Sequence, residues 1–375
     1  MLFELLRVAM GVQENISRIP TTKEWDLLFK QAQEQSLAGI CFAGIHRIVA
    51  NTDGGFAKIG MTRSQFLEWL GVSIMIQNRN RQINLRCIEL QRKLTKDRVQ
   101  FCILKGQGAG LRYPCELSIY RQSGDIDVWM SGGTDKVVAY VNSIAPTDEI
   151  TGNHVQFHLF EDTDVEMHFL PVRICNRFAN SRLKKWLALQ ESNQMHHSVS
   201  FGDAELNVPT VEFDLVYQLL HIYKHLFNEG IGLRQIMDYY YVLKSKVDDE
   251  TIQRVQKTVS VLGLDKFASA LMWVIREVFC LDDEYLLWAP NKTDGEFLLN
   301  EILQMGNFGQ GDQRFRLNKD DSHMKRYWQM SSSKWRFINH FPSEVFWQPI
   351  DLFLRFFEQR SLRKKISFVS SDTTN

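Results

Sequence analysis

Leu104-Lys105-Gly106-Gln107-Gly108 and, after a short apolar segment, Arg121-Gln122-Ser123-Gly124-Asp125-Ile126-Asp127-Val128-Trp129-Met130 decide the fold of this chain. The two aspartates of the second run alternate with aliphatic residues, and on a strand this alternation puts both carboxylates on one face. A later run, Asp164-Val165-Glu166-Met167-His168-Phe169, repeats the pattern and adds Glu166 as a third acid. The sequence therefore predicts three carboxylates on neighbouring strand faces.

Three carboxylates so close together need a partner, because like charges repel and burying unpaired carboxylates is costly. A hard divalent cation meets this need, and Mg²⁺ prefers a few carboxylates together with the phosphate oxygens of a substrate. Two such ions can clamp the attacking and leaving oxygens of a phosphoryl displacement. The glycines Gly106 and Gly108, between a predicted strand and a predicted helix, offer backbone N–H groups to phosphates.

The same acids also have a purely structural interpretation, in which they are solvated. Asp125 and Asp127 then belong to a turn after Gly124, and Glu166 is an exposed strand acid paired with a lysine. Asp164 is the rival third acid, because it shares the strand parity of Glu166 but lies nearer the turn. The aliphatic residues between the aspartates and the upstream glycines favour the metal site.

The ordered set Leu-Lys-Gly, Arg-x-x-Gly-Asp-Ile-Asp-Val, Val-Glu-Met-His and Leu-Arg-Gln-Ile-Met-Asp resembles the DNA polymerase beta-like nucleotidyltransferase superfamily. More narrowly, it resembles a little-characterised bacterial nucleotidyltransferase family. The resemblance implies an α+β fold, in which a minimal mixed β-sheet is flanked by helices, with N-terminal helices and an all-helical C-terminal domain. It also implies two Mg²⁺ ions, with Mn²⁺ as an alternative, held by Asp125, Asp127 and Glu166.

The resemblance further implies a nucleotide-binding cleft. Its predicted residues are Lys105, Gly106, Gln107, Gly108, Arg121, Gly124, His168, His225, Arg234 and Asp238. A guanidinium fork suits a bidentate grip on a triphosphate, and this is the role expected of Arg121. Gln107 stands where many superfamily members have a serine or glycine.

Two pairs in the later part of the chain have other interpretations. Arg234 and Asp238 lie four residues apart, so an intrahelical ion pair is the alternative to a place in the cleft. His221 and His225 share a helix face at a spacing that can bind zinc. No third ligand is evident for them in the sequence, and zinc is not expected.

Composition indicates a protein with a sizeable core and no bias toward nucleic acid. Of the 375 residues, 44% are hydrophobic, and the formal net charge is zero. The expected partners are a nucleoside triphosphate and an acceptor that is a small molecule, a tRNA or a protein. Net charge does not favour a nucleic acid, although a local basic patch leaves that option open.

Cysteine usage and the chain start predict a cytoplasmic protein. The six cysteines are scattered among apolar neighbours, so we expect reduced, buried thiols. Residues 1–7 resemble a short amphipathic helix rather than a signal peptide. No apolar run reaches about 18 residues, so no membrane span is expected.

The chain is predicted to divide into an N-terminal helical region that packs on the core (1–98), a catalytic core (99–210), a helical C-terminal domain (211–369) and a polar tail (370–375). Capping boxes at Thr21 and Thr62 predict helix starts, the second opening a long helix to about Asp97. Helices are expected at 134–144, 231–243, 249–262, 266–278, 293–305 and 343–357, with another from about 211. Strands are expected at 99–104, around Asp127, and as a hairpin at 154–160 and 165–169.

The resulting hypothesis is a metal-dependent nucleotidyltransferase. It moves a nucleoside monophosphate from a triphosphate to an acceptor hydroxyl and releases pyrophosphate, mainly through positioning and charge neutralisation. The alternative is a nucleotide-binding regulatory or interaction module that keeps the fold without catalysis. A metal-dependent nuclease or other hydrolase that uses the same acids ranks below both.

Overall fold

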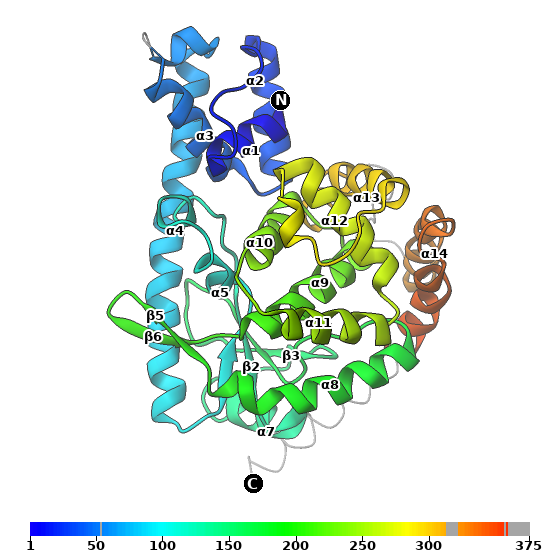
Figure 1. Cartoon of the computed structure of the whole chain (residues 1–375). Coiled ribbons are helices and arrows are strands. Elements are labelled where there is room, and N and C mark those ends of the chain that lie inside the picture. Colours follow the sequence, from blue (N-terminus) through cyan, green and yellow to red (C-terminus); the bar gives the residue numbers. More distant parts are fainter. Residues whose placement is uncertain (53–54, 313–321, 356–357, 359–375) are drawn as a thin grey trace.

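The computed structural model describes residues 1–52, 55–312, 322–355 and 358. Its fold is α+β, as predicted: a small mixed sheet with helices on both faces and a largely helical remainder (Figure 1). No helix among these residues combines the length and apolar character needed to cross a membrane. The predicted polar tail, residues 370–375, and the last two residues of the predicted helix 343–357 lie outside the described residues.

The N-terminal region consists of α1 (Leu2–Met10), α2 (Thr22–Glu34), α3 (Ala38–Ala50), the short 3-10 helix η1 (Gly55–Ile59) and the long α4 (Arg63–Lys96). Both predicted capping boxes are present, with the Thr21 and Thr62 side chains accepting hydrogen bonds from Glu24 and Gln65. The first half of α4 packs on the N-terminal helices, where the Trp69 and Phe29 rings lie 4.8 Å apart. Its second half reaches the sheet (Figure 1).

The sheet has four strands: β1 (Phe101–Ile103), β2 (Ile126–Met130), β3 (His154–Gln156) and β4 (Val165–His168). Their order is β1-β2-β4-β3. The central pair β2 and β4 is parallel, and its register sets Asp127 opposite Glu166 and Trp129 opposite His168. The other two pairs are antiparallel. Parallel pairing across this centre brings together acids that lie almost forty residues apart in the sequence.

Each face of the sheet packs on different helices. The aliphatic face, with Ile126, Val128 and Met167, forms one core with α4 and with α7 (Gly133–Asn142). The opposite face carries the acids at one end and Trp129 at the other. The Trp129 ring stacks on Phe213 of α9 (Val211–Asn228) at 5.7 Å. The acids therefore lie in the layer between the sheet and the C-terminal helices.

The helices predicted after residue 211 are present. Those predicted at 231–243, 249–262, 266–278 and 293–305 begin and end within two residues of the predicted positions, and the one predicted from 343 begins at 342. The helices after residue 211 are α9, α10 (Leu233–Leu243), α11 (Asp249–Val261), α12 (Asp265–Phe279), α13 (Lys292–Met305) and the helix at 342–355. The structure also contains α14 (His323–Ser332) and the 3-10 helices η2 (Asp283–Tyr285), η3 (Asn307–Gly309) and η4 (Ser333–Phe337). Two short helices, α5 (Gly106–Gly110) and α6 (Cys115–Ser118), follow β1.

Three features differ from the sequence-based expectations. The prediction left residues 170–210 unassigned, and the structure has α8 (Arg177–Met195) and a hairpin of β5 (Ser198–Phe201) and β6 (Ala204–Asn207) there. The predicted strand 154–160 pairs only over β3. All six cysteines are free, but Cys115 and Cys280 are exposed rather than buried, because each lies at the end of a helix near the surface.

Candidate functional site

The three predicted acids meet at the start of the parallel strand pair. Asp125 directly precedes β2, Asp127 lies within it, and Glu166 lies opposite on β4. One carboxylate oxygen from each lies within 4.8 Å of the others. Asp127 is only 2% exposed, whereas Asp125 faces the open side. The rival acid Asp164 is exposed and does not join the cluster.

Lys105 sits beneath the acid cluster on the turn between β1 and α5. Its Nζ lies 2.9 Å from Asp127 Oδ1. Its backbone adopts φ 24°, in the region that L side chains rarely occupy, and such strain persists only where the surroundings enforce it. Burial lowers the pKa of Lys105, but the charges of Asp127, Asp125 and Glu166 outweigh burial and the net pKa lies above the ordinary value. Lys105 is therefore a permanent cation at the cluster.

His168 links two of the acids. Its Nε2 lies 2.8 Å from Asp127 Oδ1 and 3.3 Å from Glu166 Oε2. The Asn153 side-chain amide donates to His168 Nδ1 at 3.2 Å, which leaves the proton on Nε2 in the neutral ring. Nε2 carries a proton in the charged ring too, so donation to Asp127 holds in both states.

The cluster carries more negative charge than its neighbours neutralise. Burial raises the pKa of Asp127, but Lys105 and His168 outweigh this and the net pKa lies below the ordinary range. Burial also raises the pKa of Glu166, but contacts that include the hydrogen bond from His168 outweigh it, and the net pKa of Glu166 lies below its ordinary value. Asp125, in contrast, has a raised pKa, first because of the nearby charge of Asp127. A bound cation would remove this repulsion.

The donor set fits a divalent cation. Asp125, Asp127 and Glu166 together offer carboxylate oxygens, the ligands that Mg²⁺ and Mn²⁺ prefer. The raised pKa of Asp125 shows the unbalanced charge that such an ion would neutralise. Within the described residues, a second group able to hold a metal consists of His154, Glu166 and His168, and it shares Glu166 with the first.

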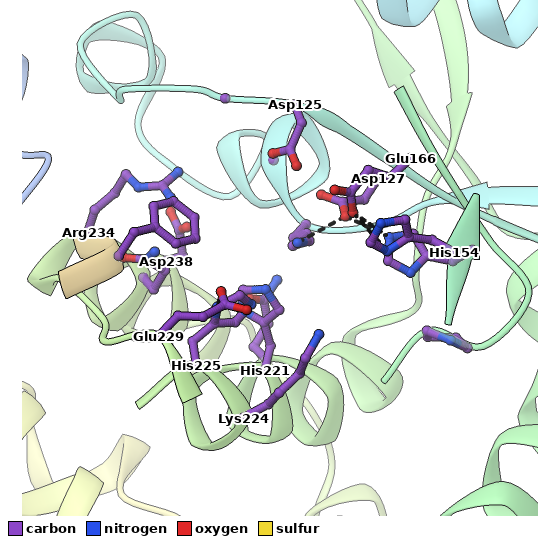
Figure 2. Close-up of a pocket in the computed structure, with 18 of the residues that line it drawn as sticks. Asp125, Asp127, His154, Glu166, His221, Lys224, His225, Glu229, Arg234 and Asp238 are labelled. Carbon is purple, nitrogen blue, oxygen red and sulfur yellow. Dashed lines mark hydrogen bonds and ion pairs between the residues drawn. The ribbon is translucent and has the colours of Figure 1, made fainter. Parts of the chain in front are cut away.

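Helices α9 and α10 form the opposite wall of the pocket. Figure 2 shows His221, Lys224 and His225 rising from α9 toward the acids, with Arg234 and Asp238 at one side. On α9 these residues belong to a largely buried helix that also carries the buried polar side chains of Asp214 and Gln218. Burial lowers the pKa of both His221 and His225, so the two rings are neutral near pH 7. The wall therefore presents neutral imidazoles beside a lysine.

Two cations of this wall have no carboxylate partner. Within the described part of the chain, neither Lys224 nor Arg234 forms an ion pair. The Glu229 carboxylate lies 3.0 Å from the His225 ring, and Asp238 pairs with Arg121. Burial is the main reason why the pKa of Lys224 and that of Arg234 lie below their ordinary values. Arg234 Nη1 donates to the Gln122 carbonyl at 3.0 Å, while its Nε has no partner. An anion in the pocket would meet both cations.

Arg121 makes contacts that differ from the expected ones. Its Nε and Nη2 donate to the two carboxylate oxygens of Asp238 at 2.7 and 2.8 Å, and Tyr113 Oη donates to the same carboxylate at 2.7 Å. The intrahelical pair of Arg234 and Asp238 considered from the sequence is therefore wrong. The guanidinium fork predicted to grip a triphosphate is occupied by a carboxylate, and Arg234 is the arginine left without one.

Most of the predicted site residues line one pocket. They are Lys105, Gly106, Arg121, Gly124, Asp125, Asp127, Glu166, His168, His225, Arg234 and Asp238. Gln107 and Gly108 do not line it. The Gln107 amide contacts Asn84 and Ser123 instead, and the Gly108 N–H donates to the Lys105 carbonyl at 2.9 Å.

Several lining residues were not predicted, namely His154, Pro171, Gln218, Lys224, Glu229, Gln235 and Phe308, and His221 was considered only for zinc. A sequence signal existed for α9, where polar residues at 218, 221, 225 and 229 recur at three- or four-residue steps along an apolar helix. Nothing comparable marks Phe308, which lies in a glycine-rich loop.

A family model described as "Uncharacterised nucleotidyltransferase" matches residues 21–280. Among solved structures, the chain is similar to an antigenic nucleotidyltransferase-like protein from Paracoccidioides brasiliensis. The match has 13% identity and a TM-score of 0.31, and it covers 53% of this chain and 92% of that one. No curated protein matches the chain.

Proposed function

The chain belongs to the uncharacterised nucleotidyltransferase family, and we propose that it moves a nucleoside monophosphate from a nucleoside triphosphate to an acceptor hydroxyl and releases pyrophosphate. One observation carries this proposal. The cluster of Asp125, Asp127 and Glu166 faces two cations without carboxylate partners, Lys224 and Arg234, across one pocket. Such a pocket suits a polyphosphate whose reacting end meets the acids and whose charge meets the cations.

The three acids would hold the divalent cations. Mg²⁺ or Mn²⁺ at this cluster would neutralise charge on the phosphates and stabilise the attacking and leaving oxygens. Lys105 and His168 fix the orientation of Asp127 through contacts of 2.9 and 2.8 Å. Glu166, with 24% of its side chain exposed, is the acid of the strand pair that an acceptor can reach. We propose that the Glu166 carboxylate accepts the proton of the attacking hydroxyl.

The other pocket residues bind rather than react. Lys224 and Arg234 would bind the non-reacting phosphates through charge-assisted hydrogen bonds, which would offset the burial that lowers the pKa of each group. Arg121 supports this wall from behind through its two-pronged contact with Asp238. The acceptor supplies a hydroxyl. The zero net charge favours a small molecule or a protein over a nucleic acid in this role.

The test is transfer of label from α-labelled nucleoside triphosphates in the presence of Mg²⁺. Candidate acceptors are offered as separate tRNA, protein and small-molecule fractions, and pyrophosphate release is measured in parallel. The wild-type protein is expected to label one fraction. Asp125→Asn/Asp127→Asn is expected to lower the rate about 1,000-fold, because the metal ligands lose their charge.

Asp164→Asn is the matched control. It removes the charge of an exposed acid that directly precedes β4 and lies outside the cluster. It should leave the rate unchanged. Circular dichroism checks that each variant is folded. Full activity in the double variant contradicts the assignment of these acids. Tight nucleotide binding by the wild type without pyrophosphate release would favour the non-catalytic module instead.

A further inference from the structure

Phe308 is an exposed aromatic residue on the wall of the same pocket. It is 54% exposed, and its ring lies edge-on to the His225 ring at 5.9 Å between centroids. Among the described residues that line the pocket, Phe308 and Pro171 are the apolar ones. The other lining side chains are charged or polar. A ligand that is anionic along most of its length and planar and apolar at one end would match this lining.

The backbone holds Phe308 in an unusual conformation. Its φ is 51° and its ψ is 33°, in the left-handed region, and it lies between Gly306 and Gly309 with φ of 65° and 70°. A bulky residue in that region is strained, and strain of this kind clusters at binding sites. Nothing in the packing of a buried core demands the aromatic ring there, because the ring points to solvent and the pocket.

The loop that carries Phe308 is tightly packed from two sides. A Cβ atom added to Gly306 would come within 2.8 Å of the Glu34 carbonyl oxygen, at the end of α2. A Cβ atom added to Gly230 would come within 2.8 Å of the Gly309 nitrogen. The loop therefore lies directly on the α2 end and on the turn between α9 and α10, and its backbone has little room to move.

Side-chain hydrogen bonds secure the same loop. The Gln235 and Asn307 side-chain amides are in contact at 2.7 Å, which ties η3 to α10. Buried Gln35 donates to the Ile302 carbonyl of α13 at 3.3 Å and accepts from the Leu233 N–H of α10 at 2.9 Å, which ties the helix before the loop to α10. Phe308 is thus displayed on a rigid support that joins the same helix, α10, that carries Arg234.

We propose that Phe308 is the platform on which the nucleobase of the triphosphate donor stacks. This inference rests on the proposed function. The Phe308 ring offers a π-face, and bases stack on aromatic side chains with little dependence on their identity. Arg234 and Lys224 line the same pocket as Phe308. The aromatic ring would therefore take the base of a nucleotide, and the two cations would take its phosphates. The subsite would accept all four bases.

The experiment measures the dissociation constants of ATP, GTP, CTP, UTP and inorganic tripolyphosphate by isothermal titration with Mg²⁺. Phe308→Leu keeps an apolar side chain without a π-face, and Phe308→Trp keeps the π-face. Phe308→Leu should weaken binding of each nucleotide about tenfold and leave tripolyphosphate binding unchanged. Phe308→Trp should retain wild-type affinity for the nucleotides.

Phe178→Leu is the control, because Phe178 is 69% exposed and does not line the pocket. It should bind all five ligands like the wild type. Unchanged nucleotide affinity in Phe308→Leu overturns the inference, and so does an equal loss for nucleotides and tripolyphosphate. If the wild type binds neither nucleotides nor tripolyphosphate, the proposed function fails, and that result is distinct from the two outcomes that overturn only the base platform.

Discussion

Asp127 is the most buried of the three acids, and its position depends on neighbours that compensate its charge. Lys105 and His168 contact the same carboxylate oxygen at 2.9 and 2.8 Å. An uncompensated buried carboxylate would be costly. His168 also reaches Glu166, so a single imidazole holds two proposed metal ligands in one arrangement. This makes His168 a positioning residue rather than one that reacts.

Replacement of His168 should weaken metal binding. His168→Ala removes the donor to Asp127, and loss of such an outer contact typically lowers metal affinity about 10- to 100-fold. His168→Gln keeps an N–H donor and should recover part of the affinity. The measurement is the free Mn²⁺ signal in electron paramagnetic resonance during titration. His196→Ala, at an exposed histidine away from the cluster, should match the wild type. Wild-type affinity in His168→Ala would argue against this role.

Single residues were predictable where the signal is local. The alternation around Asp125 and Asp127 predicts which side chains share a face, because the strand period is fixed by backbone geometry. The partner of a charged residue is not local. Asp238 pairs with Arg121, 117 positions away in the sequence, rather than with Arg234. Four-residue spacing therefore gave the wrong partner for Asp238, and the competing contact depends on tertiary packing.

Among elements, helices with caps and apolar periodicity were the most predictable. The boxes at Thr21 and Thr62 marked true helix starts. The helix α8 was not predicted, although its buried residues Ala179, Leu183 and Leu187 recur at four-residue steps. Exposed Phe178 and Leu189 on the same helix blur the contrast between its apolar and polar faces. The β5–β6 hairpin was missed because its strands are short and largely exposed.

The packing of the helix at 342–355 on α9 buries a carboxyl group. Glu344 is 3% exposed, and the Tyr223 hydroxyl of α9 donates to it. Burial raises the pKa of Glu344 from the ordinary 4.5 to about 7. Its charged neighbours act in opposite directions, since Asp351 raises this pKa and Lys334 lowers it. The folded state therefore favours the protonated carboxyl.

Stability should fall as pH rises through this window. The unfolded carboxyl ionises near its ordinary pKa of 4.5, and the folded one only near 7. The contribution is complete below about pH 4.5 and is lost by about pH 7, at a cost of about 3 kcal/mol at most. Glu344→Gln removes the titration, so its unfolding free energy relative to the wild type should increase between these pH values. Denaturant unfolding at several pH values measures the difference, and a pH-independent difference contradicts the assignment.

At the scale of the whole molecule, the cleft exists because three parts of the chain share contacts. The segment between β1 and β2 is joined to α9 and α10 by Arg112 with Asp214 at 2.7 Å and by Arg121 with Asp238. One hydrophobic core includes residues of α1–α3, the sheet and α9–α13. The acids and the cations face each other only when these parts of the chain are packed together. The predicted domain boundaries at 98 and 210 remain a prediction.

The overall fold class was predictable, and the composition of the cleft was only partly so. The resemblance in the motifs from Leu104 to Asp238 implied the sheet and the acids. The opposite wall combines α9 with a loop about eighty residues later, where Phe308 lies. No local pattern indicates that a glycine-rich loop will return to the site. Such long-range closure is determined by packing, as the close approach of Gly230 to Gly309 illustrates.

The proposed function requires that the acid cluster binds a nucleoside triphosphate through divalent cations. The most direct measurement is isothermal titration of the four nucleoside triphosphates, with and without Mg²⁺, on the wild type, Asp125→Asn/Asp127→Asn and the control Asp164→Asn. We expect Mg²⁺-dependent binding by the wild type and the control, and a loss of about 100-fold or more in the double variant. Binding that is indifferent to both Mg²⁺ and the double substitution would contradict it.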